Sequence, residues 1–177
     1  MTPKNFIDQV RELYLARKEK REIAPGIYRG TNPSVSSETE DLFARYLKER
    51  LPDTVEIWVD PQISYEAEDT DKKGRRIFRP DICVIRDNTV TGAFELKMDL
   101  GYIREEFPPY AEGRAAMLRE LGGEKGSITK RDPPEIRFAG GLVMNFVLIN
   151  DNNISRPKLR KVEDYFAATP PGPLFIL

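Results

Sequence analysis

The chain has 177 residues and a net charge of −1, with 40% hydrophobic and 32% charged residues. These values fit a single globular domain over residues 1–177, in which any nucleic-acid binding would depend on local basic patches. The chain has no histidine and one cysteine, Cys83, which excludes histidine-based catalysis, histidine zinc sites and an internal disulfide. We find no signal-peptide core and no apolar run of membrane-spanning length, so we expect a cytoplasmic protein.

The first predicted element is an amphipathic helix from residue 6 to residue 23, where apolar residues recur every three or four positions. Pro25 and Gly26 end it, because neither residue continues a helix without cost. We assign residues 4–24 to an N-terminal helical extension.

A second helix begins at Ser36 or Ser37 and ends at Pro52. Ser37 and Glu40 match a capping box, in which each side chain binds the other residue's free backbone N–H. Glu40 lies at one edge of the buried stripe of this helix, and Glu38 lies near the opposite edge. Either glutamate could therefore face a site beside the core.

Three strands follow this helix. The first covers residues 55–67, and Pro61 within it predicts an edge position or a bulge. The second covers residues 79–85 and the third residues 90–99, with a hairpin turn around Asn88. Consecutive strands of this kind can pair as an antiparallel meander.

The C-terminal half begins with a helix that a pair of glycines closes, followed by a loop over residues 124–135. Residues 142–149 form the most apolar run and predict a strand buried on both faces, as in parallel sheets. A helix over residues 156–167 and the apolar tail 174–177 form a C-terminal extension over residues 155–177. We expect the tail to dock on the core or on a partner.

The order of these elements predicts an α/β fold. A meander of three strands followed by a helix and a further strand requires a parallel crossover. We therefore expect a mixed central β-sheet flanked by α-helices on both faces, with an extra helix at each end of the chain.

Three charged residues interrupt the otherwise apolar second and third strands. Glu95 and Lys97 are two residues apart and share one face of their strand, and Asp81 opens the neighbouring strand. If the strands pair in register, the two carboxylates form an oxygen-rich site for Mg²⁺ or Mn²⁺, which can polarise a phosphodiester and lower the pKa of a bound water. Lys97 could hold that water, stabilise charge on the phosphate or, beside the cation, act as a base. The alternative is a cluster of ion pairs on an exposed sheet face.

This arrangement resembles the signature of the PD-(D/E)XK nuclease superfamily. Pro80-Asp81 is followed, after thirteen residues, by Glu95-Leu96-Lys97. The superfamily has an αβββαβ core and a restriction-endonuclease-like fold, and the predicted order over residues 37–149 matches that core.

The resemblance implies specific roles. Asp81 and Glu95 would bind a divalent metal, Lys97 would assist the attacking water, and an acid from the helix before the first strand would complete the site. Glu40 fits that last position best, because it lies three and seven residues before two buried apolar positions of its helix, and Glu38 is the alternative.

Exonuclease-type branches of the superfamily often carry a glutamine and a tyrosine on the helix after the lysine strand. The corresponding helix here has Tyr110 and Arg114 but no glutamine. The missing glutamine argues against an exonuclease, and we expect Tyr110 and Arg114 to serve helix packing and surface charge.

Two groups of basic residues could contact phosphates or could be solvated surface charges. One lies in the polar hairpin tip over residues 66–76 and consists of Lys72, Lys73, Arg75 and Arg76. The other lies on the last helix and consists of Arg156, Lys158, Arg160 and Lys161.

The sequence therefore predicts a Mg²⁺- or Mn²⁺-dependent nuclease that acts on DNA rather than RNA and cuts as an endonuclease. A homodimer would be needed for double-strand cleavage, because one such site cuts one strand. The alternative is a catalytically inactive subunit of the same fold that binds nucleic acid or joins an assembly.

Overall fold

The computed structural model describes residues 1–19, 22–24, 27–28, 35–67, 74–100, 106–151, 153–168 and 171–177. The chain divides into two compact units, Met1–Asp53 and Thr54–Leu177, and each is described by itself. The single domain with a core over residues 37–149 stays a prediction. In the described ranges no helix is both long enough and apolar enough to cross a membrane.

The first unit contains two helices, α1 (Pro3–Glu19) and α2 (Ser36–Lys48). Phe6 of α1 packs against Phe43 and Tyr46 of α2, with ring centroids 5.7 and 5.5 Å apart. The predicted helix over residues 6–23 is confirmed except at its end.

The predicted end of the first helix is wrong at residues 22–24. β1 (Glu22–Ala24) pairs antiparallel with β2 (Ile27–Tyr28), so the backbone hydrogen bonds of residues 22–24 go to a strand.

The capping box predicted at Ser37 and Glu40 is also wrong. The N-cap of α2 is Val35, which makes no side-chain capping bond, so Ser37 already lies inside the first turn. The Ser36 hydroxyl instead donates a hydrogen bond to Glu40 Oε1 at 3.2 Å. Thr39 Oγ1 donates to the carbonyl of Val35 at 2.8 Å, and Thr39 is fully buried.

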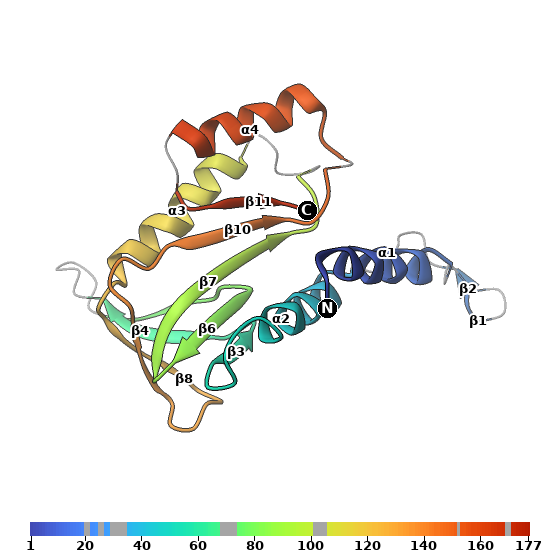
Figure 1. Cartoon of the computed structure of the whole chain (residues 1–177). Helices are drawn as coiled ribbons and strands as arrows, with labels where there is room; N and C mark the ends of the chain where they lie inside the picture. Colours follow the sequence, from blue (N-terminus) through green and yellow to red (C-terminus); the bar gives the residue numbers. More distant parts are fainter. Residues whose placement is uncertain are drawn as a thin grey trace. The chain divides into compact units, whose positions relative to one another are not determined.

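The second unit is an α/β structure with a mixed nine-stranded sheet (Figure 1). Its strands are β3 (Glu56–Val59), β4 (Ile63–Ala67), β5 (Gly74–Phe78), β6 (Ile82–Arg86), β7 (Thr89–Lys97), β8 (Lys125–Ile128), β9 (Glu135–Phe138), β10 (Met144–Leu148) and β11 (Leu174–Ile176). Its helices are α3 (Phe107–Glu120) and α4 (Arg156–Ala168).

Strand β7 is the longest strand and has neighbours on both sides. On one side it pairs antiparallel with β6 through a two-residue turn, in which Asp87 and Asn88 have φ angles of 49° and 57°. Positive φ at both positions gives the turn type that matches the twist of a tight hairpin. On its other side β7 pairs in parallel with β10 and with β9. Both the predicted hairpin and the predicted parallel crossover are confirmed.

The predicted first strand over residues 55–67 is two strands with different partners. β3 pairs with β6, whereas β4 pairs with β5 and β8. Asp60, between β3 and β4, has a φ of 46°, which interrupts an extended backbone. The meander β3–β6–β7 therefore forms as predicted, with the β4–β5 hairpin inserted into it.

The loop predicted over residues 124–135 is wrong. It contains β8 and the start of β9, which pair antiparallel with Lys125 opposite Arg137. β8 includes a glycine and a serine and lacks apolar alternation, whereas β9 alternates polar and apolar residues but is only four residues long, so neither strand stands out in the sequence.

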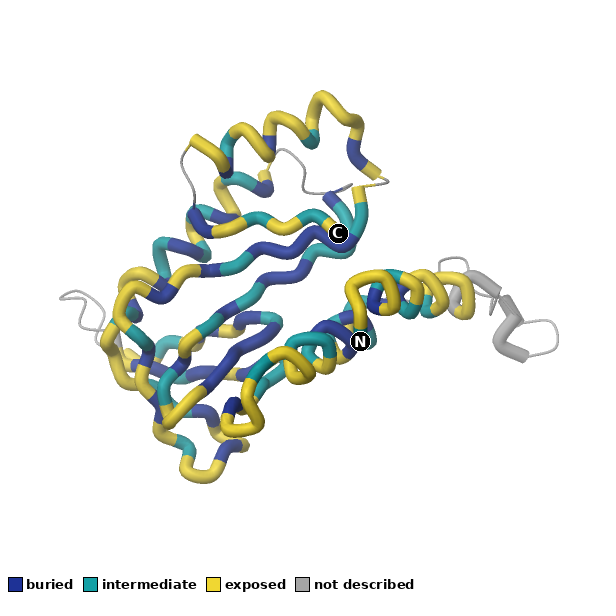
Figure 2. Tube along the Cα trace, in the orientation of Figure 1, coloured by how far each residue is buried: buried dark blue, intermediate teal, exposed yellow. Residues whose placement is uncertain are grey.

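Helices α3 and α4 pack together on one face of β10 (Figure 1). Three aromatic rings form this contact. The ring centroid of Phe107 of α3 lies 6.0 Å from that of Phe146 of β10 and 5.7 Å from that of Phe166 of α4. Figure 2 shows buried residues along β7 and β10 and mostly exposed residues along the outer side of α4. This packing fixes the height and direction of α3 above the sheet.

The C-terminal tail docks on the core, which was one of the two predicted alternatives. β11 pairs in parallel with β10 and extends the sheet by one edge strand. Gly172 lies directly against the backbone of Met144, where a Cβ atom would collide with the Met144 carbonyl oxygen. The close approach of the chain at this point therefore requires glycine.

Candidate functional site

The register of β6 and β7 brings Asp81, Glu95 and Lys97 together. Ile82 lies opposite Phe94, so Asp81, one residue before β6, lies beside Glu95 and Leu96. One carboxylate oxygen of Asp81 accepts a hydrogen bond from the backbone N–H of Leu96 at 2.6 Å. The predicted meeting of the three charged residues is confirmed.

Glu95 is a buried carboxylate, with 4% of its surface exposed. Lys97 extends on the same face of β7 and places its ammonium 2.8 Å from Glu95 Oε1. The alternative of an exposed surface cluster is therefore wrong for Glu95, because α3 covers this face of the sheet.

The pKa of Lys97 is raised above its ordinary value. Burial by itself lowers this pKa, but the charge and hydrogen bond of Glu95 outweigh it, with further contributions from Tyr110 and Asp81. In this arrangement Lys97 is an ammonium ion at neutral pH and serves as a hydrogen-bond donor.

Two residues of α3 complete the surroundings of Glu95, and the prediction that they serve only packing and surface charge is wrong. The Tyr110 hydroxyl donates a hydrogen bond to Glu95 Oε1. Arg114 donates to Glu95 Oε2 from Nε at 3.2 Å and lies 3.0 Å from it through Nη2. Arg114 Nη2 also donates to the backbone carbonyl of Arg79 at 2.5 Å.

The spacing of residues along α3 could have indicated that Tyr110 and Arg114 face the site. Phe107, Tyr110 and Arg114 are three and then four residues apart, which places them on one face of a helix. Phe107 is the buried anchor of that face, so Tyr110 and Arg114 continue it toward the strand that carries Glu95.

Tyr110 has a perturbed hydroxyl. Burial, together with the hydrogen bond to the negatively charged Glu95, raises the pKa of Tyr110 to about 12. The hydroxyl is therefore neutral at physiological pH and remains a donor to the carboxylate. The Lys97 ammonium lies 4.8 Å from the centre of the Tyr110 ring, a favourable distance for a cation–π contact.

The site balances its own charges. Two carboxylates, Asp81 and Glu95, face two cations, Lys97 and Arg114, and both Glu95 oxygens accept bonds from these cations or from Tyr110. Carboxylate oxygens are the ligands that Mg²⁺ and Mn²⁺ prefer, so the chemistry of the two acids fits such an ion. Within the described part of the chain, no three Cys, Asp or Glu side chains cluster closely enough to hold a metal.

Glu40 and Glu38, the two candidates for a further acid, lie on α2 in the Met1–Asp53 unit. Glu40 accepts the hydroxyl of Ser36. The role of either residue beside Asp81 and Glu95 stays a prediction.

The basic hairpin residues fall into two groups. Lys72 and Lys73 lie outside the described residues. Arg75 and Arg76 belong to β5 rather than to a hairpin tip, and as neighbours in a strand they project to opposite faces. Their role in nucleic-acid binding stays a prediction.

Arg75 belongs to a polar groove of about 580 Å³ across β4, β5, β8 and β9. Lys125 and Arg137 line the same groove, and Arg75 donates a hydrogen bond to Ser127 Oγ at 3.3 Å. Three cations thus gather on one face of paired strands. Glu66 and Glu124 also line this groove, so its charge is mixed.

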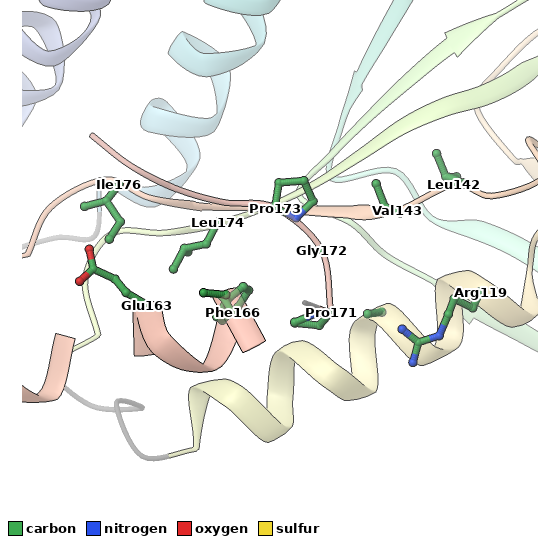
Figure 3. A pocket seen from close by; sticks show the side chains of 12 residues that line it. Arg119, Leu142, Val143, Glu163, Phe166, Pro171, Gly172, Pro173, Leu174 and Ile176 are labelled. Carbon is green, nitrogen blue, oxygen red and sulfur yellow. The ribbon is translucent and has the colours of Figure 1, made fainter. Parts of the chain in front are cut away.

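A second groove of about 830 Å³ lies between α3, α4 and the segment leading into β11 (Figure 3). Its lining is largely apolar, with Phe166 and Leu174 on one side and Leu142 on the other. Asp81, Glu95 and Lys97 are not part of its lining, so this cavity is separate from the charged site.

Comparison with known proteins gives no name for this site. No protein-family model matches the chain, and no curated protein is significantly similar to it in sequence.

Proposed function

We propose that this chain is a metal-dependent nuclease that hydrolyses phosphodiester bonds of DNA. The observation that carries the proposal is the β6–β7 register, which brings Asp81, Glu95 and Lys97 together beneath α3. Two carboxylates and an ammonium ion are a sufficient set for this chemistry in a chain without histidine.

The order of elements supports membership of the PD-(D/E)XK superfamily and a restriction-endonuclease-like fold. α2 precedes the antiparallel strands β3, β6 and β7, and α3 then leads to β10, which is parallel to β7. The β4–β5 and β8–β9 hairpins would be insertions into this αβββαβ order.

Asp81 and Glu95 would hold the Mg²⁺ or Mn²⁺ ion. When bound, the ion would supply Lewis-acid activation of the phosphate and a lowered pKa for an attacking water. Lys97, whose ammonium lies 2.8 Å from Glu95 Oε1, would orient the water and stabilise negative charge that develops on the phosphate. The backbone N–H of Leu96 fixes one oxygen of Asp81, which limits the orientations of that carboxylate.

The proposal predicts metal-dependent cleavage that requires Lys97. Supercoiled plasmid, linear duplex and single-stranded DNA would be incubated with Mg²⁺ or Mn²⁺, using wild type and Lys97→Ala. We expect Lys97→Ala to lower the rate at least about 100-fold, because a donor to the developing charge is lost. Lys130→Ala, which removes an exposed lysine outside this cluster, is the matched control and should cleave like wild type.

The proposal fails if wild type and Lys97→Ala give the same background on all three substrates. Nicking of plasmid without linearisation would indicate a monomer, whereas direct linearisation would support the homodimer that double-strand cleavage needs. An exonuclease would instead degrade only the linear substrates.

One observation favours an inactive nucleic-acid-binding or assembly subunit as the second candidate. Both oxygens of Glu95 already accept bonds from the chain's own cations, as they would in a purely structural cluster. Isothermal titration with Mn²⁺ separates the two functions. Binding that Asp81→Asn abolishes supports the nuclease, and the absence of any such binding supports the inactive subunit.

A further inference from the structure

We propose that Arg114 regulates the metal site by competing with the divalent ion for Glu95. The guanidinium holds Glu95 Oε2, so a metal ion could bind that oxygen only when Arg114 releases it. The inference rests on the proposed function, since it concerns the same pair of carboxylates.

Arg114 is held at several points around its guanidinium. Its Nε and Nη2 atoms lie 3.2 and 3.0 Å from Glu95 Oε2, and Nη2 donates to the carbonyl of Arg79 at 2.5 Å. The guanidinium carbon lies 5.0 Å from the centre of the Phe78 ring. The Arg114 side chain is 17% exposed, so water screens its ion pair with Glu95 only in part.

The competition follows from the lone pairs of Glu95. Oε1 accepts bonds from Lys97 and Tyr110, and Oε2 is taken by Arg114. A carboxylate has about four lone-pair positions, and a metal ion needs at least one of them. We expect Oε2 to become available to the metal. Its cation, Arg114, comes from α3, whereas the cation on Oε1, Lys97, lies on the same strand as Glu95.

The charges of the site also require Arg114 to release Glu95 before a metal ion can bind. Two carboxylates and two cations gather here, so a divalent ion would enter against the positive charges of Lys97 and Arg114 together. An arginine cannot relieve this repulsion by becoming neutral, because a guanidinium keeps its positive charge in proteins. It must leave Glu95 as a cation, and a guanidinium is well suited to bind a phosphate oxygen instead.

The test is Mn²⁺ affinity without nucleic acid, measured by isothermal titration on the full chain. We expect Arg114→Gln to bind Mn²⁺ at least about tenfold more tightly than wild type, because one competing charge is gone. Arg114→Lys keeps the positive charge, so its Mn²⁺ affinity should be closer to that of wild type. Arg119→Gln is the matched control on the same helix, since Arg119 is exposed and pairs with Glu112.

A second measurement is made on wild type itself, and the conservative variant Arg114→Lys serves only to assign the signal. The Arg114 Nε–H resonance of wild type, assigned by its absence in Arg114→Lys, should move toward that of a free arginine as Mg²⁺ is added. An unchanged resonance at saturating Mg²⁺ would overturn the inference.

The outcomes separate this inference from the proposed function. Equal Mn²⁺ affinity in wild type and Arg114→Gln, lost in both when Asp81→Asn is added, overturns the competition and leaves the nuclease proposal intact. The absence of Asp81-dependent binding in every variant contradicts both.

Discussion

At the scale of single residues, Tyr110 gives the clearest titration signal. Its pKa is raised from 10.0 to about 12 by burial and by its hydrogen bond to Glu95. The folded state therefore keeps a proton that the unfolded state loses between these values. Stability from this group is complete below pH 10 and is lost as the pH rises toward 12.

We predict that Tyr110→Phe reduces the fall in the free energy of unfolding between pH 10 and 12. At neutral pH, Tyr110→Phe should lower the free energy of unfolding by about 1 kcal/mol, because one hydrogen bond to a charged group is lost at a partly exposed position. Urea unfolding at several pH values measures both effects, and ultraviolet absorbance follows the phenolate directly. An unchanged pH profile in Tyr110→Phe would show that Tyr110 ionises like an ordinary tyrosine.

The sequence predicted the residues of this site on β6 and β7 but not those on α3. Asp81, Glu95 and Lys97 follow from strand alternation and from a hairpin whose turn residues are visible in the sequence. Arg114 and Tyr110 reach Glu95 only because α3 lies at one particular height above β7. That height is set by the contact of Phe107 with β10 and α4, which are distant in sequence.

At the scale of elements, a buried arginine joins three segments of the second unit. Arg131, between β8 and β9, is 7% exposed and binds both carboxylate oxygens of Glu56 on β3, at 2.7 and 3.0 Å. It also donates to Asn88 in the β6–β7 turn at 2.6 Å and to the carbonyl of Pro133 at 2.6 Å. The hydrogen bonds that Glu56 accepts from Arg131 and from Trp58 lower the pKa of Glu56.

We predict that Arg131→Ala lowers the free energy of unfolding by about 2–3 kcal/mol. The variant leaves two carbonyl groups and a carboxylate without this donor, and the estimate lies below the range for fully buried pairs because Glu56 is half-exposed. Arg131→Lys should recover only part of this loss, since an ammonium cannot form the two-pronged contact. Urea denaturation provides the measurement.

The neighbouring Lys130→Ala is the control for this prediction. Lys130 is exposed, and its removal should change stability by no more than about 0.5 kcal/mol. A similar small change in Arg131→Ala would mean that Arg131 does not hold these segments together.

The errors in the predicted elements share one physical cause. β8 is a polar strand and β9 is only four residues long. Both depend on pairing, with β4 and β7 respectively, and a short sequence window contains no information on those partners. The division of residues 55–67 into β3 and β4 likewise depends on which strands each one meets. By contrast, β7, β10 and α4 were predicted closely, because their own apolar patterns determine which faces are buried.

At the scale of the whole molecule, a net charge of −1 gives no general attraction to DNA. The DNA binding that we propose would therefore come from places where the fold collects cations. The polar groove with Arg75, Lys125 and Arg137 is one such place, and strand pairing puts Lys125 opposite Arg137. Arg75 donates to Ser127 Oγ and Arg137 to the Gly123 carbonyl, and side chains ordered before binding lose less entropy when they meet a phosphate.

We predict that this groove contacts the DNA backbone. Each phosphate contact contributes about 0.9 to the slope of log affinity against log salt concentration, so removal of three cations should reduce that slope by about two to three. The measurement is fluorescence anisotropy of a labelled duplex without divalent ions, comparing wild type with the combined Arg75→Ala, Lys125→Ala and Arg137→Ala variant.

The exposed cations of α4 provide the matched control. A combined Arg156→Ala, Lys158→Ala and Arg160→Ala variant removes the same number of positive charges from a single helix that also carries Glu163 and Asp164. Because long-range attraction changes equally in the two variants, a difference in slope between them reports direct contacts. A reduced slope in the α4 variant with an unchanged slope in the groove variant would place the DNA backbone on α4 instead.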